Sequence, residues 1–330
     1  MERDVEVLSV PFGLGAGVSG SEHGPEAVVA ENLLHRLRAS GRRVRHRIIE
    51  ADGGAVRSKR SSAVFGAPAP VDRSGDSGGK PGDAGCAFRS GANGGPEGMK
   101  HEAEVLAINM LLAKETAEAA KQGRFPLVIG GDHSIAIGSL AGLASHYRKL
   151  GVIWFDAHAD LNTELTSPSG NMHGIPLAVG LNRSRLKLAD VWRGAMPLRP
   201  ERMAIVAARD IDPGEKELIR EAGIRLFAMK EIRERGIERV MLEALHIAGN
   251  GADGVHFSFD IDSVDPLEAP GTGTPVPEGL TSHEAYAAFG VLRRAGRITS
   301  MDAVEVNPLL DGRGGRTAKL AAKLIVSLFK

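Results

Sequence analysis

The sequence predicts an α/β fold in which a mostly parallel β-sheet lies between two layers of helices. Short, continuous apolar runs alternate with helical stretches along most of the 330 residues. Such runs are typical of parallel strands that are covered on both faces, and their alternation with helices is typical of one parallel sheet. We therefore expect a three-layer α/β/α architecture, with residues 1–330 forming a single domain.

The expected elements follow one another in a regular order. Gly24 and Pro25 mark the start of the first helix, because proline is favoured at the first helical position. Strands are expected at residues 5–12, 44–50, 126–130, 152–155, 203–207, 224–228, 254–259 and 298–306. Helices are expected at residues 24–40, 101–122, 135–150, 214–222, 230–248, 282–295 and 317–329. In such a sheet, ligands bind beyond the carboxyl ends of the strands.

Residues 51–98 interrupt this pattern. They are rich in Gly, Ser, Pro and Ala and contain almost no large apolar side chains. A segment of this composition cannot bury enough surface to offset the entropy that it would lose on ordering. We expect a flexible, low-complexity insertion within the domain.

Composition limits the classes of function. The formal net charge is zero, whereas a nucleic-acid-binding protein normally has a basic excess. Cys86 is the only cysteine, which excludes an internal disulfide and a cysteine-based metal site. The chain shows neither a membrane-spanning run nor a signal peptide. These features predict a cytoplasmic protein without a nucleic-acid or membrane partner.

Acidic and imidazole side chains follow three of the expected strands. The motifs are GGDHS at residues 130–134, DAHAD at residues 156–160 and DID at residues 260–262. Taken alone, the first could be a corner in which Asp132 or Ser134 caps a helix, and the last could be a solvated loop. The Asp-x-His-x-Asp motif is more specific, because side chains spaced by two at the end of a strand converge on one side.

Taken together, the motifs predict a metal site. Four aspartates would place a charge of about −4 at one end of the sheet, which is costly unless cations lie between them. Two divalent cations would offset this charge, and an oxygen-rich site with some imidazole favours manganese over zinc. The candidate ligands are His133, Asp156, His158, Asp160, Asp260 and Asp262.

These motifs resemble those of the ureohydrolases and, within that family, those of the arginases. The likeness extends over nearly the whole chain outside the insertion, and it includes residues 122–129 (QGRFPLVI), 258–266 (SFDIDSVDP) and 305–308 (EVNP). It implies an arginase/deacetylase-like fold, two Mn²⁺ per subunit and a homo-oligomer, either a trimer or a hexamer. It also implies that His133, Asp156, Asp160 and Asp260 hold one manganese, that His158, Asp156, Asp260 and Asp262 hold the other, and that Asp156 and Asp260 bridge them.

The reaction that this resemblance implies is hydrolysis of L-arginine to L-ornithine and urea. A guanidinium carbon is a poor electrophile, but a metal ion can lower the pKa of bound water to about 7. We therefore expect a metal-bridging hydroxide to attack this carbon in a binuclear manganese site. Asp160 would orient the hydroxide, and His173 would donate a proton to the leaving amine. Alternatively, His173 is a capping or packing residue.

The loop at residues 161–174 is expected to select the substrate. It is dense in hydroxyl and amide groups, which can donate hydrogen bonds to a carboxylate without adding charge. An ordinary polar turn is the alternative. The resemblance implies contacts to the α-carboxylate from Asn162, Ser167, Ser169 and Asn171, and a contact to the α-ammonium from Asp212. Position 167 is often Thr in arginases, so Ser167 is a small departure that keeps the hydroxyl.

Glu305 lies in an apolar segment, residues 301–306, and needs a partner there. A guanidinium is a planar group that matches a carboxylate with two hydrogen bonds. The resemblance therefore assigns Glu305 to the substrate guanidinium, with help from the hydroxyl of Thr274. The alternative is an ion pair with a nearby arginine.

Three other functions are alternatives. An agmatinase, or a ureohydrolase for another guanidino or formimino substrate, would keep the metal ligands. Agmatinase-like relatives lack the Ser-Gly-Asn-x-His-Gly loop, whose donors would carry a desolvation cost without a carboxylate partner. A non-catalytic metal-binding member of the fold would be expected to have lost a ligand, the Glu or the His. A zinc amidohydrolase of the deacetylase fold would not require Glu305.

Overall fold

A single nine-stranded sheet forms the centre of the protein. The computed structural model describes residues 3–52, 55–60 and 98–330. The strand order is β3-β2-β1-β4-β9-β8-β5-β6-β7, and every neighbouring pair is parallel except the edge pair β2 and β3. The strands are β1 (Val5–Val10), β2 (Val44–Asp52), β3 (Ala55–Arg60), β4 (Phe125–Gly130), β5 (Leu150–Phe155), β6 (Met203–Ala208), β7 (Arg225–Ala228), β8 (Gly254–Asp260) and β9 (Ser300–Val304).

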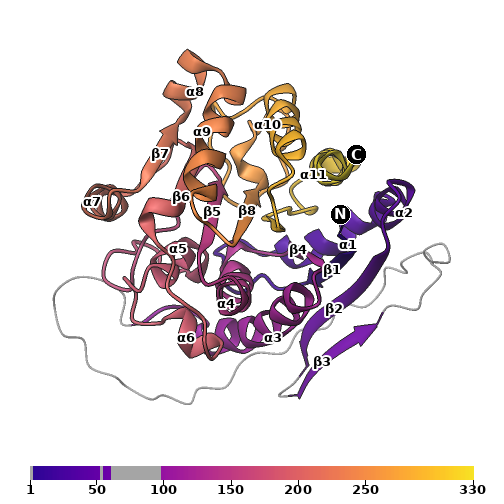
Figure 1. Cartoon of the computed structure of the whole chain (residues 1–330), viewed down its shortest axis with the longest axis horizontal. Helices are drawn as coiled ribbons and strands as arrows, with labels where there is room; N and C mark the ends of the chain where they lie inside the picture. Colours follow the sequence, from indigo (N-terminus) through magenta and orange to yellow (C-terminus); the bar gives the residue numbers. More distant parts are fainter. Residues whose placement is uncertain (1–2, 53–54, 61–97) are drawn as a thin grey trace, which may run out of the picture.

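Helices cover both faces of the sheet (Figure 1). One face packs against α1 (Gly24–Ala30), α2 (Leu33–Ala39), α8 (Met229–Arg235), α9 (Ile237–Gly249), α10 (Ser282–Ala295) and α11 (Arg316–Phe329). The other packs against α3 (Glu102–Lys121), α4 (Ala136–His146), α5 (Pro176–Gly180), α6 (Leu188–Val191) and α7 (Pro213–Ala222). In β1, Val7 belongs to the first core and Leu8 to the second, because successive strand side chains point to opposite faces. The expected three-layer α/β/α architecture is confirmed.

Two of the expected helices are each divided in two. The helix expected at residues 24–40 is interrupted at Asn32, which has a left-handed φ of 59°. The helix expected at residues 230–248 is divided into α8 and α9 at Gly236, where φ is 81°. Neither conformation continues an α-helix, whose φ values are close to −60°.

The segment predicted to be an insertion begins with regular structure. Ala51 and Asp52 end β2, and Ala55–Arg60 form β3, which pairs antiparallel with β2 at the edge of the sheet. These residues form strands where the sequence predicted a flexible segment without regular structure. The strand signal was weak because Val56 is the only β-branched or aromatic residue in β3, whereas charged residues are typical of edge strands. Residues 61–97 lie outside the described residues.

The four central strands position the candidate site. The neighbours β4, β9, β8 and β5 are parallel, so their carboxyl ends meet at one edge of the sheet. The GGDHS motif follows β4, the DAHAD motif follows β5, the DID motif overlaps the end of β8, and Glu305 follows β9. None of the helices in the described residues is long and apolar enough to span a membrane.

Candidate metal centre

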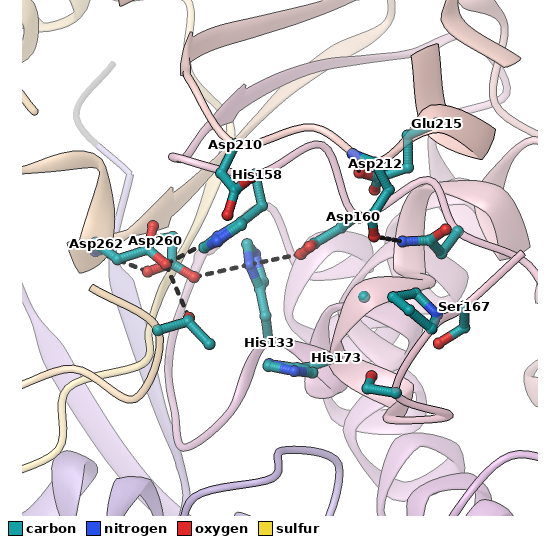
Figure 2. Close-up of a pocket in the computed structure, with 15 residues that line it drawn as sticks. His133, His158, Asp160, Ser167, His173, Asp210, Asp212, Glu215, Asp260 and Asp262 are labelled. Atoms are coloured by element: carbon teal, nitrogen blue, oxygen red, sulfur yellow. Dashed lines mark hydrogen bonds and ion pairs between the residues drawn. The ribbon is translucent and has the colours of Figure 1, made fainter. Parts of the chain in front are cut away.

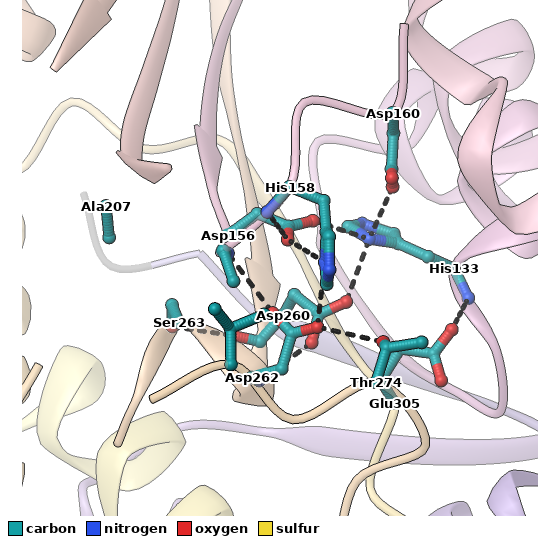
Figure 3. Close-up of polar contacts among 12 residues, drawn as sticks. His133, Asp156, His158, Asp160, Ala207, Asp260, Asp262, Ser263, Thr274 and Glu305 are labelled. Carbon is teal, nitrogen blue, oxygen red and sulfur yellow. Dashed lines mark hydrogen bonds and ion pairs between the residues drawn. The ribbon is translucent and has the colours of Figure 1, made fainter. Parts of the chain in front are cut away.

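The turn after β4 is tightly packed, and it carries both a capping residue and a candidate metal ligand. A Cβ atom on Gly131 would lie 1.8 Å from the carbonyl oxygen of Phe12, so only glycine fits there. The Asp132 carboxylate accepts hydrogen bonds from the backbone N–H groups of Ser134 (2.9 Å) and Gly15 (2.8 Å). Asp132 is therefore a cap, as the structural alternative for this motif expected. The next residue, His133, points instead into the cluster of aspartates (Figure 3).

His133 lies at the centre of three carboxylates. Its Nδ1 atom is 3.0 Å from Oδ2 of Asp156, 3.0 Å from Oδ2 of Asp160 and 3.1 Å from Oδ2 of Asp260. His133, Asp156 and Asp260 are buried side chains at the ends of three different strands. The fold thus brings one nitrogen and three oxygens together around one point.

A second group of ligand atoms lies beside the first. Nδ1 of His158 is 3.1 Å from Oδ2 of Asp262 and 3.4 Å from Oδ1 of Asp156. Asp156 takes part in both groups, since its Oδ2 faces His133 and its Oδ1 faces His158. In each of the groups His133/Asp156/Asp160 and Asp156/His158/Asp262, the ligand atoms lie within 4.8 Å of one another.

Bound metal ions would satisfy the polar atoms of this cluster better than hydrogen bonds within the cluster can. A ring nitrogen can donate at most one hydrogen, yet three carboxylate oxygens surround Nδ1 of His133 at similar distances. Neither this nitrogen nor Oδ2 of Asp156 forms a hydrogen bond of normal geometry with any described residue. Buried polar atoms without partners are rare, and a cation among them would satisfy both. The carboxylate and imidazole chemistry of the set is that of divalent-metal ligands.

Charge repulsion within the cluster supports the same conclusion. Burial raises the pKa of Asp260 well above its ordinary value, and the charges of Asp262 and Asp156 raise it further. Burial and the charge of Asp156 likewise raise the pKa of Asp160, to about 6. Carboxylates that resist ionisation in this way would be stabilised by positive charge between them.

Neighbouring groups hold the cluster in its orientation. The other ring nitrogen of His133 lies 2.8 Å from the Ser258 hydroxyl, and its ring stacks on Trp154 at a centroid distance of 4.1 Å. The backbone N–H of Ala157 donates to Oδ1 of Asp262 at 3.1 Å. Such contacts fix the rotamers of metal ligands. Asp160 has a left-handed φ of 51°, a strained conformation for aspartate of the kind that is found at functional sites.

The cluster opens into a cavity of about 120 Å³ (Figure 2). Lining residues from the predicted metal set are His133, His158, Asp160, Asp260 and Asp262. Lining residues from the predicted substrate set are Asn162, Ser167, Ser169, His173, Asp212 and Thr274. Figure 2 shows Asp260 and Asp262 on one side, Asp212 and Ser167 toward the other, and Asp160 between them.

Three predicted residues do not line the cavity. Asp156 is fully buried. The side chain of Asn171 instead contacts Lys100. Glu305 is almost fully buried, and its Oε1 accepts a hydrogen bond from the backbone N–H of His133 at 2.8 Å and lies 3.2 Å from Nδ1 of His173. No arginine among the described residues forms an ion pair with Glu305.

His173 and Thr274 have protein partners at the cavity. Burial lowers the pKa of His173, but the hydrogen bond to Glu305 and the charge of Glu305 outweigh this effect and raise it to about 9. The Thr274 hydroxyl donates to Oδ2 of Asp262 at 3.2 Å. Thr274 therefore contacts the metal cluster in addition to lining the cavity.

Two further acidic residues, Asp210 and Glu215, line the cavity and are absent from the predicted set. The carboxylate of Glu215 accepts hydrogen bonds from the backbone N–H groups of Leu161 and Asp212, both at 2.9 Å, and so joins the two loops. Burial raises the pKa of Glu215 to about 7. The available signal was Asp212 followed three residues later by Glu215, but that spacing is also typical of a helix capping box, which is present here.

A three-layer α/β fold with imidazole and carboxylate ligands at the ends of its central strands defines a class of metal-dependent enzymes. The sequence model of the Arginase family matches residues 3–330, and the chain belongs to this family of hydrolases. It is 39% identical over 327 residues to an arginase of Bacillus caldovelox, covering 99% of this chain and 98% of that protein. An arginase of Bacillus subtilis (strain 168) is also 39% identical, over 328 residues, with coverage of 99% and 98%.

Solved structures show the same similarity to arginases. The native arginase structure from Bacillus caldovelox superposes with a TM-score of 0.83 at 38% identity, covering 99% of this chain and 98% of that chain. The Entamoeba histolytica arginase, solved in complex with L-ornithine, superposes with a TM-score of 0.79 at 28% identity and the same coverage.

Proposed function

We propose that the protein hydrolyses the guanidinium group of L-arginine to L-ornithine and urea, with two Mn²⁺ per subunit. The observation that carries this proposal is the shape of the site, in which a cluster of metal-ligand atoms adjoins a cavity rich in hydroxyl, amide and carboxylate groups. Membership of the arginase family supports it. A cytoplasmic location, a homo-oligomer, and a single domain over residues 1–330 that carries an insertion stay predictions.

Two overlapping ligand sets would hold the ions. His133, Asp156, Asp160 and Asp260 would hold one, and His158, Asp156, Asp260 and Asp262 would hold the other. When bound, divalent ions make water a competent nucleophile near neutral pH by lowering its pKa. Nδ1 of His133 and Nδ1 of His158 each face the shared carboxylate of Asp156, which supports two adjacent ions.

Asp160 and His173 would handle protons during the reaction. Asp160 both faces His133 and lines the cavity, so its carboxylate can accept a hydrogen bond from the attacking water and orient it. The C–N bond that breaks leaves an amine, which needs a proton. A pKa raised to about 9 favours the protonated His173 ring at neutral pH. Its Nδ1 faces Glu305, so Nε2 would be the atom that donates to the amine of ornithine.

Opposite ends of the cavity would bind opposite ends of the substrate. Oε1 of Glu305 is already engaged, so Oε2 would contact the guanidinium. Asp212 would face the α-ammonium, and its Oδ2 accepts a 2.7 Å hydrogen bond from the amide of Asn162. Asn162, Ser167, Ser169 and Asn171 would donate hydrogen bonds to the α-carboxylate. A related arginase, that of Entamoeba histolytica, was solved in complex with L-ornithine, which carries both of these groups.

Product analysis tests the proposal. Protein loaded with Mn²⁺ should convert L-arginine to equal amounts of L-ornithine and urea, as measured by mass spectrometry. Urea without ornithine, or no urea at all, would contradict it.

An agmatinase is the second candidate, because its substrate would use the same metal cluster. The donor-rich loop at residues 161–174 favours arginine, since agmatine has no carboxylate to accept those hydrogen bonds.

A further inference from the structure

Lys100 contacts the predicted substrate loop from outside the cavity. It precedes α3 and is exposed. Its Nζ atom donates a hydrogen bond to Oδ1 of Asn171 at 3.1 Å, and its backbone N–H donates to the carbonyl oxygen of Gly170 at 2.9 Å. The backbone contact does not depend on the side chain. A substitution at Lys100 can therefore remove the ammonium group and leave the backbone contact in place.

The ammonium group determines the orientation of the Asn171 amide. A lysine ammonium has three donors and no acceptor, so it must face the amide oxygen rather than the amide nitrogen. The Nδ2 group, with its two hydrogens, consequently faces away from Lys100. It lies close to Gly17, where an added Cβ atom would be 2.8 Å from Nδ2. The loop that contains Gly15 and Gly17 also contacts the cavity wall, because the carbonyl oxygen of Gly15 accepts a hydrogen bond from the backbone N–H of His173 at 3.1 Å.

The charge of the cavity makes this orientation important for a carboxylate. The acidic lining residues are Asp160, Asp210, Asp212, Glu215, Asp260 and Asp262, and no lysine or arginine is among the described residues that line it. Metal ions would neutralise the end with the cluster, but Asp212 and Glu215 lie toward the opposite end (Figure 2). A substrate carboxylate there needs oriented donors and a nearby positive charge.

We propose that Lys100 is a positioning residue that determines specificity for substrates with an α-carboxylate. Its ammonium holds the amide oxygen of Asn171, which directs the two Nδ2 hydrogens away from Lys100, and it adds a positive charge behind that amide. This inference rests on the proposed function. Lys100 acts through Asn171 and does not touch the reacting atoms, so it affects substrate binding and leaves the chemical step unchanged.

Steady-state kinetics of Lys100→Met tests this role. The KM for L-arginine should rise about three- to tenfold with kcat unchanged, because a hydrogen bond to a charged group is lost at an exposed position. The kcat/KM for agmatine should not change, since agmatine has no carboxylate. Lys100→Arg should retain the wild-type KM, because a guanidinium is also a donor-only cation. Lys121→Met, at the exposed end of α3, is the matched control and should behave as wild type.

The outcomes separate this inference from the proposed function. Wild-type protein that releases no urea from L-arginine would contradict the proposed function. If wild-type protein prefers L-arginine but the KM of Lys100→Met is unchanged, the proposed role of Lys100 is overturned and the proposed function stands. Equal losses with L-arginine and agmatine would also overturn it, because they would indicate a general distortion of the site. Thermal denaturation of each variant should match wild type, since the side chain is exposed.

Discussion

Nδ1 of His173 lies 3.2 Å from Oε1 of Glu305, although the two residues are 132 positions apart in the sequence. The same oxygen accepts a hydrogen bond from the backbone N–H of His133. Glu305 thereby connects the candidate proton donor to the turn that carries a candidate metal ligand. Glu305 has a left-handed φ of 62°, a strained backbone conformation that the surrounding contacts maintain.

This pair predicts a shift in the pKa of His173. Replacing Glu305 with Gln should lower the pKa of His173 from about 9 toward its ordinary value of 6.5, because the negative charge that outweighs burial is removed. The folded-state pKa is raised, so the pair stabilises the fold fully below pH 6.5, and this contribution is lost as the pH rises through about 9. NMR titration of the imidazole measures the shift. His46, whose pKa is lowered by burial, is an internal control and should not change.

Removing the imidazole of His173 should slow the chemical step. General acid catalysis contributes about 10²- to 10⁴-fold, so His173→Asn should lower kcat by roughly that factor. Bound metal should remain at the wild-type amount, because His173 is not in either ligand group. Turnover assays with parallel metal analysis test both statements. A variant with wild-type kcat would show that His173 is only a packing residue.

Metal stoichiometry tests the two ligand groups. His158 belongs to the second group only, so His158→Ala should lower bound manganese from two ions per chain toward one. His146→Ala is the matched control, because His146 is exposed at the end of α4. Elemental analysis after dialysis gives the count. Two ions retained by His158→Ala would contradict the assignment of this ligand.

The buried carboxylate of Asp302 should stabilise the fold. Asp302 on β9 accepts a hydrogen bond from the Ser139 hydroxyl, and its Oδ2 lies 3.3 Å from Nε2 of His256. Asp302→Ala would remove the carboxylate that faces Ser139 and His256 in the core, at a cost of about 3–5 kcal/mol in the free energy of unfolding. Urea denaturation measures this cost. Asp302→Asn, which keeps an acceptor for the Ser139 hydroxyl, should lose less, and equal losses would contradict the role of this hydrogen bond.

The sequence could predict the sheet and the metal cluster because both depend on local patterns. The expected strands are continuous apolar runs, and His133, Asp156 and Asp260 lie at, or within three residues of, strand ends that a parallel sheet must bring together. The candidate substrate contacts depended on resemblance to a family. Their hydroxyl and amide groups are common in any polar turn.

Other parts of the site could not be predicted because they depend on tertiary contacts. The hydrogen bond of Lys100 to Asn171 and the link that Glu215 makes between two loops join residues far apart in the sequence. The partner of Glu305 could not be predicted either. An acidic residue in an apolar segment needs a partner, but the sequence did not indicate that His173 is one of its partners. The edge strand β3 was missed because its residues have weak strand propensity.

Urea release by chelator-treated protein tests the central claim most directly. The assay compares L-arginine with agmatine, each with and without added Mn²⁺. Two manganese ions acting beside a carboxylate-binding loop predict activity that requires Mn²⁺ and that is much greater with L-arginine. Metal-independent activity, or a preference for agmatine, would contradict this account of the site.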